Sequence, residues 1–363
     1  MSRSEPPLSR LMSVSELPSE IQGPSAWYGP EQDARRDWIH DLSAGELGEI
    51  ERAVQATVDR LHDPERDLVS LRKEDFPLPA LAQRLARILD DVLSGRGFAL
   101  IRRLPVERWS PLQRAVAFCG LGVHWGNLRS QNAEGHVLGH VKDLGDPSAP
   151  RIYKTNKRQG YHTDSCDVVA LLCLSTAKEG GLSSLVSSVT LLNEVRCRRP
   201  DLLGCLFAPI ETDRRGEIPE GQLPYFRIPV FNWHAGLLSA IYQRKYIDDA
   251  RKLPGVPPYT SQQVEAIDLL DQLADDPALH LRMAFRPGDV QLVHNHSLLH
   301  DRTAFVDWPE PERKRHLLRL WIAPPGARPL PEVFAERFGS ITPGDRGGVV
   351  VHGTQLVAPL DVT

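Results

Sequence analysis

Apolar residues recur every three to four positions in four segments of the chain, a spacing typical of amphipathic helices. In the segment from Ser43 to about Arg60, Leu47, Ile50 and Val54 fall on one face. Ser43 and Glu46 there have the spacing of a capping box. We expect further helices over residues 79–94, 110–122 and 260–274, and an irregular stretch from residue 1 to about 40, where prolines are frequent.

Strand patterns dominate from about residue 135 onward. One strand is predicted earlier, over 97–104, directly after the second helix. Alternating or short continuous apolar runs, bounded by turn residues, predict the later strands over 136–144, 168–176, 180–189, 223–233, 237–243, 280–285, 288–294 and 314–324. Short strands with long inserts are typical of a β-barrel or double-sheet roll rather than a doubly wound sheet. The sequence contains no glycine-rich phosphate loop and no Gly-x-Gly-x-x-Gly motif at the start of a helix.

Composition narrows the possible classes of protein. The 363 residues are 41% hydrophobic and 25% charged, with a net charge of -4, so the chain has the composition of a soluble globular protein. Neither a basic stripe for nucleic acid nor an apolar run of membrane-spanning length is present, and the N-terminus has no secretory signal pattern. We therefore expect a cytoplasmic protein that binds neither nucleic acid nor membranes, whose five cysteines are mostly buried thiols.

The stretch YHTDSCD contains the first candidate for chemistry. His162 and Asp164 are two residues apart, so on an extended strand their side chains share one face. Alone, the pair could be a metal site, an acid/base pair or a surface hydrogen bond, and Cys166 is a less favoured candidate ligand. Three histidines downstream could complete a metal site: His294, His296 and His300. Two histidines and one carboxylate form the facial arrangement of non-haem iron(II) oxygenases.

Such oxygenases commonly use 2-oxoglutarate, a dianion whose far carboxylate needs a cationic partner. Arg315 and Arg319, four apart in a predicted strand, could supply the bidentate guanidinium geometry. A hydroxyl from Ser183 or Ser184 could assist.

The order of these motifs, HTD, GGLSS, NHSLLHDRTAF and RHLLRLW, resembles the taurine dioxygenase-like (TauD/TfdA) family of iron(II)/2-oxoglutarate oxygenases. It is also similar to clavaminate synthase and γ-butyrobetaine hydroxylase. The resemblance implies a double-stranded β-helix (jelly roll) core flanked by N-terminal and inserted helices. It implies an N-terminal arm and helices over 1–94, an oxygenase domain over 95–325 with a lid insert around 205–285, and a C-terminal tail over 326–363.

The resemblance also implies roles for individual residues. The expected ligands of iron are His162, Asp164 and His300, with His294 and His296 in a supporting position. The expected partners of 2-oxoglutarate are Arg315, Arg319 and Ser183, and which arginine binds its far carboxylate stays open. Dioxygen would be the second cosubstrate, and ascorbate could stimulate turnover.

The expected reaction is oxidation of an unactivated C–H bond of a small carboxylated metabolite, with release of succinate and carbon dioxide. Hydroxylation is favoured, and desaturation or cyclisation is the alternative. A metal-binding β-roll without oxygenase activity is the rival class. Five basic residues of the insert indicate an anionic group on the substrate: Arg214, Arg215, Arg227, Arg244 and Lys245.

Overall fold

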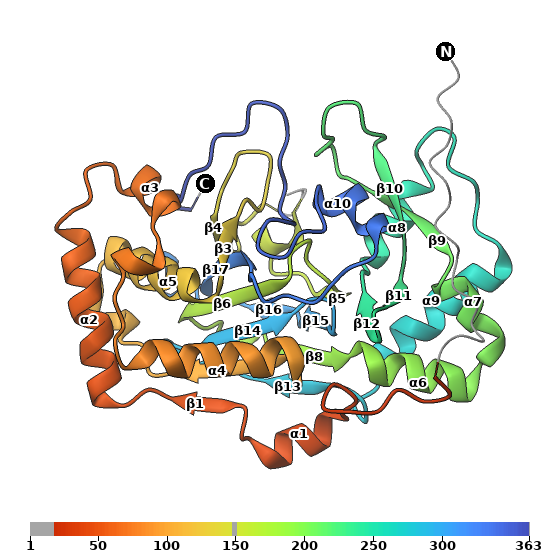
Figure 1. Cartoon of the computed structure of the whole chain (residues 1–363), viewed down its shortest axis with the longest axis horizontal. Coiled ribbons are helices and arrows are strands. Elements are labelled where there is room, and N and C mark those ends of the chain that lie inside the picture. The colour runs from red at the N-terminus through yellow and green to blue at the C-terminus, as the bar shows by residue number, and fades with distance from the viewer. Residues whose placement is uncertain (1–17, 147–150, 363) are drawn as a thin grey trace.

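A computed structural model describes residues 18–146 and 151–362 (Figure 1). Residues 1–17 of the expected irregular N-terminal stretch lie outside the described part. The remainder of that stretch contains a short helix, α1 (Gly29–Arg35), with Pro30 in its first turn.

Two sheets face each other and form a jelly roll, as the sequence predicted. The larger sheet has the order β1-β2-β14-β6-β17-β3, with β4 also paired to β17. Its strands are β1 (Ile39–Asp41), β2 (Phe98–Arg102), β3 (Asn127–Arg129), β4 (Leu138–Lys142), β6 (Val168–Ser175), β14 (Val290–His294) and β17 (His316–Ala323). The smaller sheet has the order β13-β8-β15-β5. Its strands are β5 (Gln159–His162), β8 (Ser183–Ser187), β13 (Leu281–Met283) and β15 (Leu298–Arg302).

Strand β6 explains why its sequence is an almost unbroken apolar run. Its side chains alternate between two cores. Val168, Ala170 and Leu172 join the core beneath the N-terminal helices. Val169 and Cys173 join the core between the two sheets. Both faces of the strand are therefore covered.

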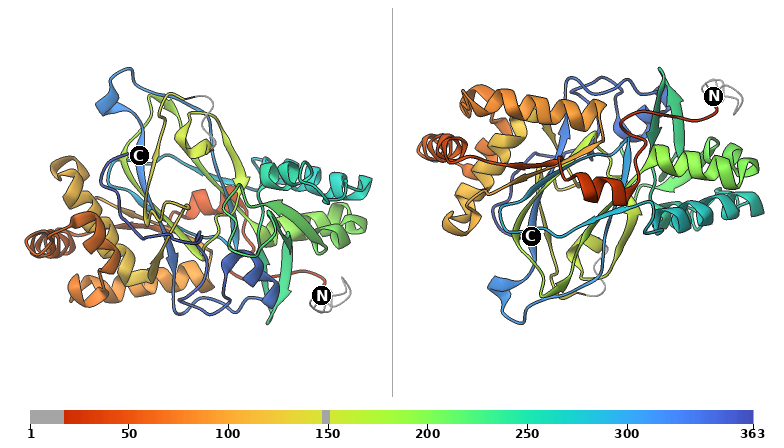
Figure 2. Two further views of the ribbon diagram at one scale, coloured as in Figure 1. Left: turned by 90° about the horizontal axis from the view of Figure 1, so that it is seen from above. Right: turned by 90° about the horizontal axis from the view of Figure 1, so that it is seen from below.

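The N-terminal helices cover the outer face of the larger sheet (Figures 1 and 2). They are α2 (Ala44–Val58), α3 (Pro64–Asp67), α4 (Leu81–Ser94) and α5 (Pro111–Trp125). The predicted capping box of α2 is present, because the Ser43 hydroxyl accepts a hydrogen bond from the Glu46 amide and the Glu46 carboxylate accepts one from the Ser43 amide. The helices predicted over 43–60, 79–94 and 110–122 are confirmed.

A second group of helices and hairpins packs at the other end of the roll, around a separate apolar core. The helices are α6 (Ser188–Arg198), α7 (Leu203–Leu206), α8 (Arg244–Ala250) and α9 (Ser261–Ala274). The hairpins are β9 (Pro209–Asp213) with β10 (Tyr225–Pro229), and β11 (Phe231–His234) with β12 (Leu237–Ala240). A further pair joins β7 (Glu179–Gly180) to β16 (Phe305–Val306). The strand predicted over 180–189 was too long: Ser187 caps α6 through its hydroxyl, and the helix begins at Ser188.

After β17 the chain folds back over the roll and ends in irregular structure with one short helix, α10 (Ala335–Phe338). Phe334 and Phe338 pack on Phe226 and Ile228 of β10. None of the helices in residues 18–146 and 151–362 is both long and apolar enough to cross a membrane.

Candidate metal centre and substrate pockets

The structure brings together His162, Asp164 and His300. His162 at the end of β5 lies directly opposite His300 in β15, and their ring centroids are 4.1 Å apart. Asp164 follows two residues after β5, with Oδ1 3.7 Å from His162 Nε2 and Oδ2 3.9 Å from His300 Nε2. One ligand atom from each residue lies within 4.8 Å of the other two. Residues separated by more than a hundred positions thus converge where two neighbouring strands pair.

The protonation of these three groups suits a divalent cation. Nδ1 of His162 lies 2.8 Å from the Gly160 carbonyl oxygen, which can only accept, so the proton sits on Nδ1. The unprotonated Nε2 accepts a hydrogen bond from the Gln159 side-chain amide at 2.8 Å and lies 3.7 Å from Asp164 Oδ1. Burial lowers the pKa of both imidazoles, that of His300 to about 3. Burial alone would raise the pKa of Asp164, but the charge of Arg319 and the hydrogen bond from Trp321 hold it below its ordinary value. The donor set is therefore two neutral imidazoles and one carboxylate, which fits iron(II).

Neighbouring groups fix the carboxylate of Asp164. The Trp321 indole N–H donates to Oδ2 at 2.9 Å, and Arg319 Nη1 lies 3.4 Å from the same oxygen. The Asp164 amide donates to the side-chain oxygen of Asn295 at 2.9 Å. Asn295, which stands between His294 and His296 in the sequence, thus positions the backbone of Asp164.

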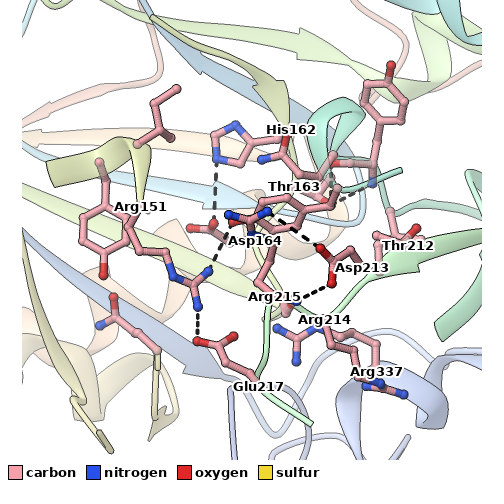
Figure 3. A pocket seen from close by; sticks show the side chains of 18 of the residues that line it. Arg151, His162, Thr163, Asp164, Thr212, Asp213, Arg214, Arg215, Glu217 and Arg337 are labelled. Carbon is pink, nitrogen blue, oxygen red and sulfur yellow. Dashed lines mark hydrogen bonds and ion pairs between the residues drawn. The ribbon is translucent and has the colours of Figure 1, made fainter. Parts of the chain in front are cut away.

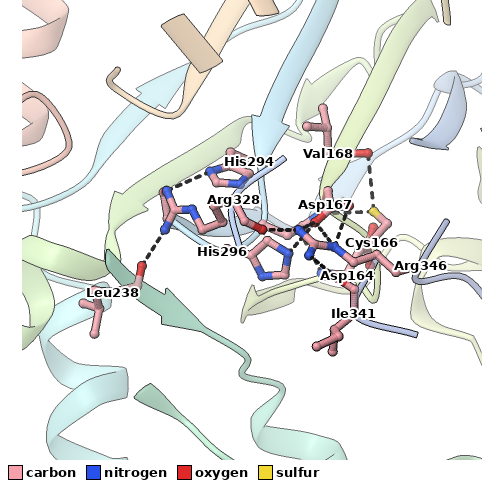
Figure 4. Close-up of polar contacts among 12 residues, drawn as sticks. Asp164, Cys166, Asp167, Val168, Leu238, His294, His296, Arg328, Ile341 and Arg346 are labelled. Carbon is pink, nitrogen blue, oxygen red and sulfur yellow. Dashed lines mark hydrogen bonds and ion pairs between the residues drawn. The ribbon is translucent and has the colours of Figure 1, made fainter. Parts of the chain in front are cut away.

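The other candidate ligands turn away from this centre. His294 Nδ1 lies 2.8 Å from the Ser297 hydroxyl, and His296 Nε2 lies 2.8 Å from Asp167 Oδ1 (Figure 4). Cys166 is fully buried, and burial raises its thiol pKa well above the ordinary value. A thiol in that protonation state is a poor metal ligand.

Arg315 lies in a narrow pocket beside His300 that Ser183 and Arg319 also line. It is 4% exposed, and its guanidinium has no hydrogen-bond or ion-pair partner in the described part of the chain. Burial lowers its pKa to about 10. A buried guanidinium without a counter-ion is costly unless an anion binds it. The GG of the GGLSS motif makes room for this side chain, because a Cβ on Gly181 would lie 2.9 Å from Arg315 Nε.

The two candidate arginines of β17 differ in their surroundings. Arg319 Nε donates to Gln131 at 2.7 Å, and its other end faces Asp164. Ser183 shares a hydrogen bond of 3.2 Å with Gln291. Sequence reasoning missed Arg302, although it lies within the quoted DRTAF motif. It is 7% exposed in the same narrow pocket as Arg315.

A second pocket opens on the Asp164 side of the centre, with residues of the β9–β10 hairpin and α10 in its walls (Figure 3). Of the insert residues expected to bind an anion, Arg214 and Arg215 line it. Arg215 is paired with Asp249 at 2.8 Å, and Lys245 contacts the same carboxylate. Arg244 is paired with Asp271 at 2.7 Å. Arg227 is exposed to solvent.

A fully buried ion pair lies behind the metal centre, and nothing in the sequence indicated it. Arg346 is 0% exposed and donates to both oxygens of Asp167, with the shortest contact 2.7 Å. It also donates to the carbonyls of Ile341 and Arg328. The Arg328 guanidinium in turn bonds to Ser297 at 2.6 Å and to the Leu238 carbonyl (Figure 4). These contacts fasten the C-terminal segment to the loop between β5 and β6, which contains Asp164 and Asp167.

A jelly roll whose paired strands hold two histidines and a carboxylate beside a buried, unpaired arginine defines the class of iron(II)- and 2-oxoglutarate-dependent oxygenases. Residues 64–321 match the taurine catabolism dioxygenase TauD, TfdA family, and the chain belongs to this family. It is an oxidoreductase, and iron(II), 2-oxoglutarate and dioxygen are its cofactor and cosubstrates. The fold and family that the sequence predicted are both confirmed.

Characterised relatives cover most of the chain. FR-33289 synthase of Streptomyces rubellomurinus is 30% identical over 327 residues, covering 88% of this chain and 94% of that protein. The taurine hydroxylase-like protein SAT17 of Stachybotrys chartarum is 29% identical, covering 86% and 84%. A uridine-5'-phosphate dioxygenase of a Streptomyces species is 26% identical, covering 63% and 86%.

Solved structures share the fold at low sequence identity. Asparagine oxygenase with Fe(II), hydroxyasparagine and succinate has a TM-score of 0.63 at 17% identity, covering 78% of this chain and 93% of that one. The non-haem iron oxygenase OrfP with iron and α-ketoglutaric acid has a TM-score of 0.58 at 14% identity, with the same coverage.

Proposed function

We propose that the enzyme hydroxylates an unactivated C–H bond of a small anionic metabolite, with 2-oxoglutarate converted to succinate and carbon dioxide. The proposed ligands of the ferrous ion are His162, Asp164 and His300. The observation that carries this assignment is their convergence within 4.8 Å, with the two imidazoles neutral and the carboxylate ionised. The metal supplies the oxidising chemistry once dioxygen and 2-oxoglutarate have bound.

The chain's own residues orient the reactants. We assign the far carboxylate of 2-oxoglutarate to Arg315, because that guanidinium is buried, unpaired and in the pocket next to His300. Ser183 would add a hydroxyl to the same carboxylate. Arg319 would instead hold Asp164, together with Trp321. Val169 and Leu317, which line the same pocket, would keep water away from the cosubstrate.

The printed chemistry of relatives supports hydroxylation of a polar, charged metabolite. Solved neighbours hold hydroxyasparagine or hydroxy-arginine beside iron and succinate. A related dioxygenase is named for uridine-5'-phosphate. The lid role of residues 205–285 stays a prediction, supported by the contribution of the β9–β10 hairpin to the wall of the second pocket.

Metal and cosubstrate binding test the proposal before any substrate is known. Under anaerobic conditions the full-length protein should bind one ferrous ion, and adding 2-oxoglutarate should produce a visible charge-transfer band. The variant His300→Ala should lose both signals. His352→Ala is the matched control, because the His352 side chain is 90% exposed, and it should retain both. Unchanged metal binding in His300→Ala would refute the ligand assignment. Dioxygen-derived oxygen in the product would then distinguish hydroxylation from desaturation.

A further inference from the structure

The second pocket carries an excess of positive charge that the metal centre does not use. Arg151, Arg214 and Arg337 line it, and so do His162 and Asp164, so it is continuous with the metal centre. The pocket wall also contains Glu217, which forms an ion pair with Arg151. Figure 3 shows Arg214, Arg337 and Glu217 on one side of Asp164.

Arg214 is built into the wall without a counter-ion. Arg214 directly follows the last residue of β9 and is only 3% exposed. Nε and Nη2 donate to the carbonyl oxygens of Leu223 and Glu336, at 3.0 and 2.6 Å. Nη1 has no partner in the described part of the chain. The carboxylate of Glu336 accepts a hydrogen bond from the backbone N–H of Arg227 at 2.7 Å, and it attracts Arg214 without forming an ion pair with it.

Arg337 adds a second positive charge to the pocket wall, and the carboxylates of Glu217 and Asp164 attract it without forming an ion pair. It makes no hydrogen bond or ion pair with residues 18–146 or 151–362. Arg214 and Arg337 line the same pocket, and burial together with the charge of Arg337 lowers the pKa of Arg214 to about 10. The complete lining of the pocket has five arginines, Arg151, Arg214, Arg215, Arg319 and Arg337, and three carboxylates, Asp164, Asp213 and Glu217, so two positive charges remain. Two guanidiniums in one pocket wall repel each other, and an anion bound between them relieves that repulsion.

We propose that Arg151, Arg214 and Arg337 form a binding site for a phosphoryl dianion of the substrate, either a phosphate monoester or a phosphonate. Guanidinium groups bind tetrahedral phosphoryl oxygens through paired, charge-assisted hydrogen bonds. A dianion matches both remaining charges, whereas the carboxylate expected from the sequence would neutralise one. The inference rests on the proposed function, because the anion held here would present the adjoining carbon atoms of the substrate to the metal centre.

The affinities of small probe anions show whether the site selects its ligand by the ligand's charge or by its shape. Isothermal titration would use full-length protein with anaerobic ferrous ion and saturating 2-oxoglutarate, which occupies the Arg315 pocket. Acetate is a planar monoanion, methanesulfonate a tetrahedral monoanion, and methylphosphonate and methyl phosphate are tetrahedral dianions. We expect both dianions to bind at least about tenfold more tightly than either monoanion. If methylphosphonate binds more tightly than methyl phosphate, the substrate group is a phosphonate. If methyl phosphate binds more tightly, it is a phosphate ester.

Two variants with the same change of charge locate the site. Arg337→Gln should weaken methylphosphonate binding by about tenfold or more, because one charge-assisted contact is lost. Arg227→Gln, an exposed position, should bind the probes like the wild type. Equal affinity for methanesulfonate and methylphosphonate, or an Arg337→Gln variant with unchanged affinity, would overturn the proposal. Circular dichroism verifies that both variants are folded.

The same titrations separate this inference from the proposed function. If the wild type fails to bind ferrous ion and 2-oxoglutarate, the proposed function fails. The probe anions are then titrated into the protein alone, and dianion binding that depends on Arg337 still supports the arginine site. If 2-oxoglutarate binds and no dianion does, the arginine site alone is refuted.

Discussion

Replacing Asp167 by asparagine removes the only negative charge that contacts the buried guanidinium of Arg346 in the described structure. Asp167 and Arg346 are both 0% exposed, and Asp167 also accepts a hydrogen bond from His296 at 2.8 Å. The substitution preserves shape and changes charge. It would leave Arg346 and the neighbouring Arg328 buried without a counter-ion.

Removing one partner of a buried ion pair costs about 3–5 kcal/mol. Asparagine still accepts one hydrogen bond from Arg346, so we expect a loss near the lower end, about 3 kcal/mol. That is a large fraction of the roughly 5–15 kcal/mol that stabilises a folded domain. Denaturation with urea, followed by circular dichroism, measures the difference in the free energy of unfolding.

Asp345→Asn is the matched control, because Asp345 pairs with Arg129 at 3.2 Å but its side chain is 78% exposed. An exposed pair contributes about 0–1 kcal/mol, so this variant should unfold almost like the wild type. If Asp167→Asn cost less than about 1 kcal/mol, the reasoning about the uncompensated charge would be wrong.

The same pair sets the dependence of stability on pH. Burial alone would raise the pKa of Asp167, but hydrogen bonds from His296 and Arg346 and their charges hold it below its ordinary value. The unfolded chain has the ordinary pKa of about 3.9, so the pair contributes its full stability above that pH. The contribution is lost as pH falls through the lower, folded-state pKa. The difference in stability between wild type and Asp167→Asn should therefore shrink below about pH 4 and stay constant from about pH 5 to 7.

Three further substitutions test the metal centre and the cosubstrate pocket. Arg315→Gln should raise the KM for 2-oxoglutarate about tenfold or more, whereas Arg313→Gln, 50% exposed, should not; equal effects would contradict the assignment. Gly181→Ala should raise the same KM, because the new Cβ would displace the Arg315 side chain. It should also lower the free energy of unfolding by roughly 1–3 kcal/mol in urea denaturation, because the φ of Gly181 is +66°. Wild-type values of both quantities would count against this packing. Trp321→Phe removes the 2.9 Å hydrogen bond to Asp164 and should weaken ferrous-ion binding about tenfold in anaerobic titration, and unchanged affinity would exclude a role in holding that carboxylate.

The sequence predicted the parts of the fold that local patterns determine. The capping box at Ser43 marked the start of α2, because side-chain and backbone atoms three residues apart form hydrogen bonds with each other. The helix predicted over 260–274 is α9, and it begins with the same kind of capping box at Thr260. The nearly continuous apolar run of residues 168–176 predicted a strand, and the structure shows that both faces of β6 are covered. The strand over 180–189 was predicted too long, because the cap at Ser187 looks like ordinary strand sequence.

Spacing and motif order were enough to select the candidate metal ligands, but they could not predict which groups surround each arginine. Arg315 and Arg319 have the same spacing pattern, and the structure alone shows that Arg319 faces Asp164 while Arg315 has no partner. Arg337 and Arg346 gave no signal at all, because a buried arginine has the same sequence appearance as an exposed one. The basic residues of the insert pointed to an anion, yet Arg244 is neutralised by neighbouring carboxylates.

The family match ends at residue 321, yet the chain that follows contributes Arg337 to the second pocket and Arg346 to the buried ion pair. Mutations in this C-terminal segment can thus change which substrate the enzyme accepts, while the metal centre at β5 and β15 stays unchanged. Homologues with the same oxidative chemistry and different substrates should differ after residue 321 as well as at the other pocket positions. A fragment that stops at residue 321 would lack Arg337 and the ion pair between Arg346 and Asp167.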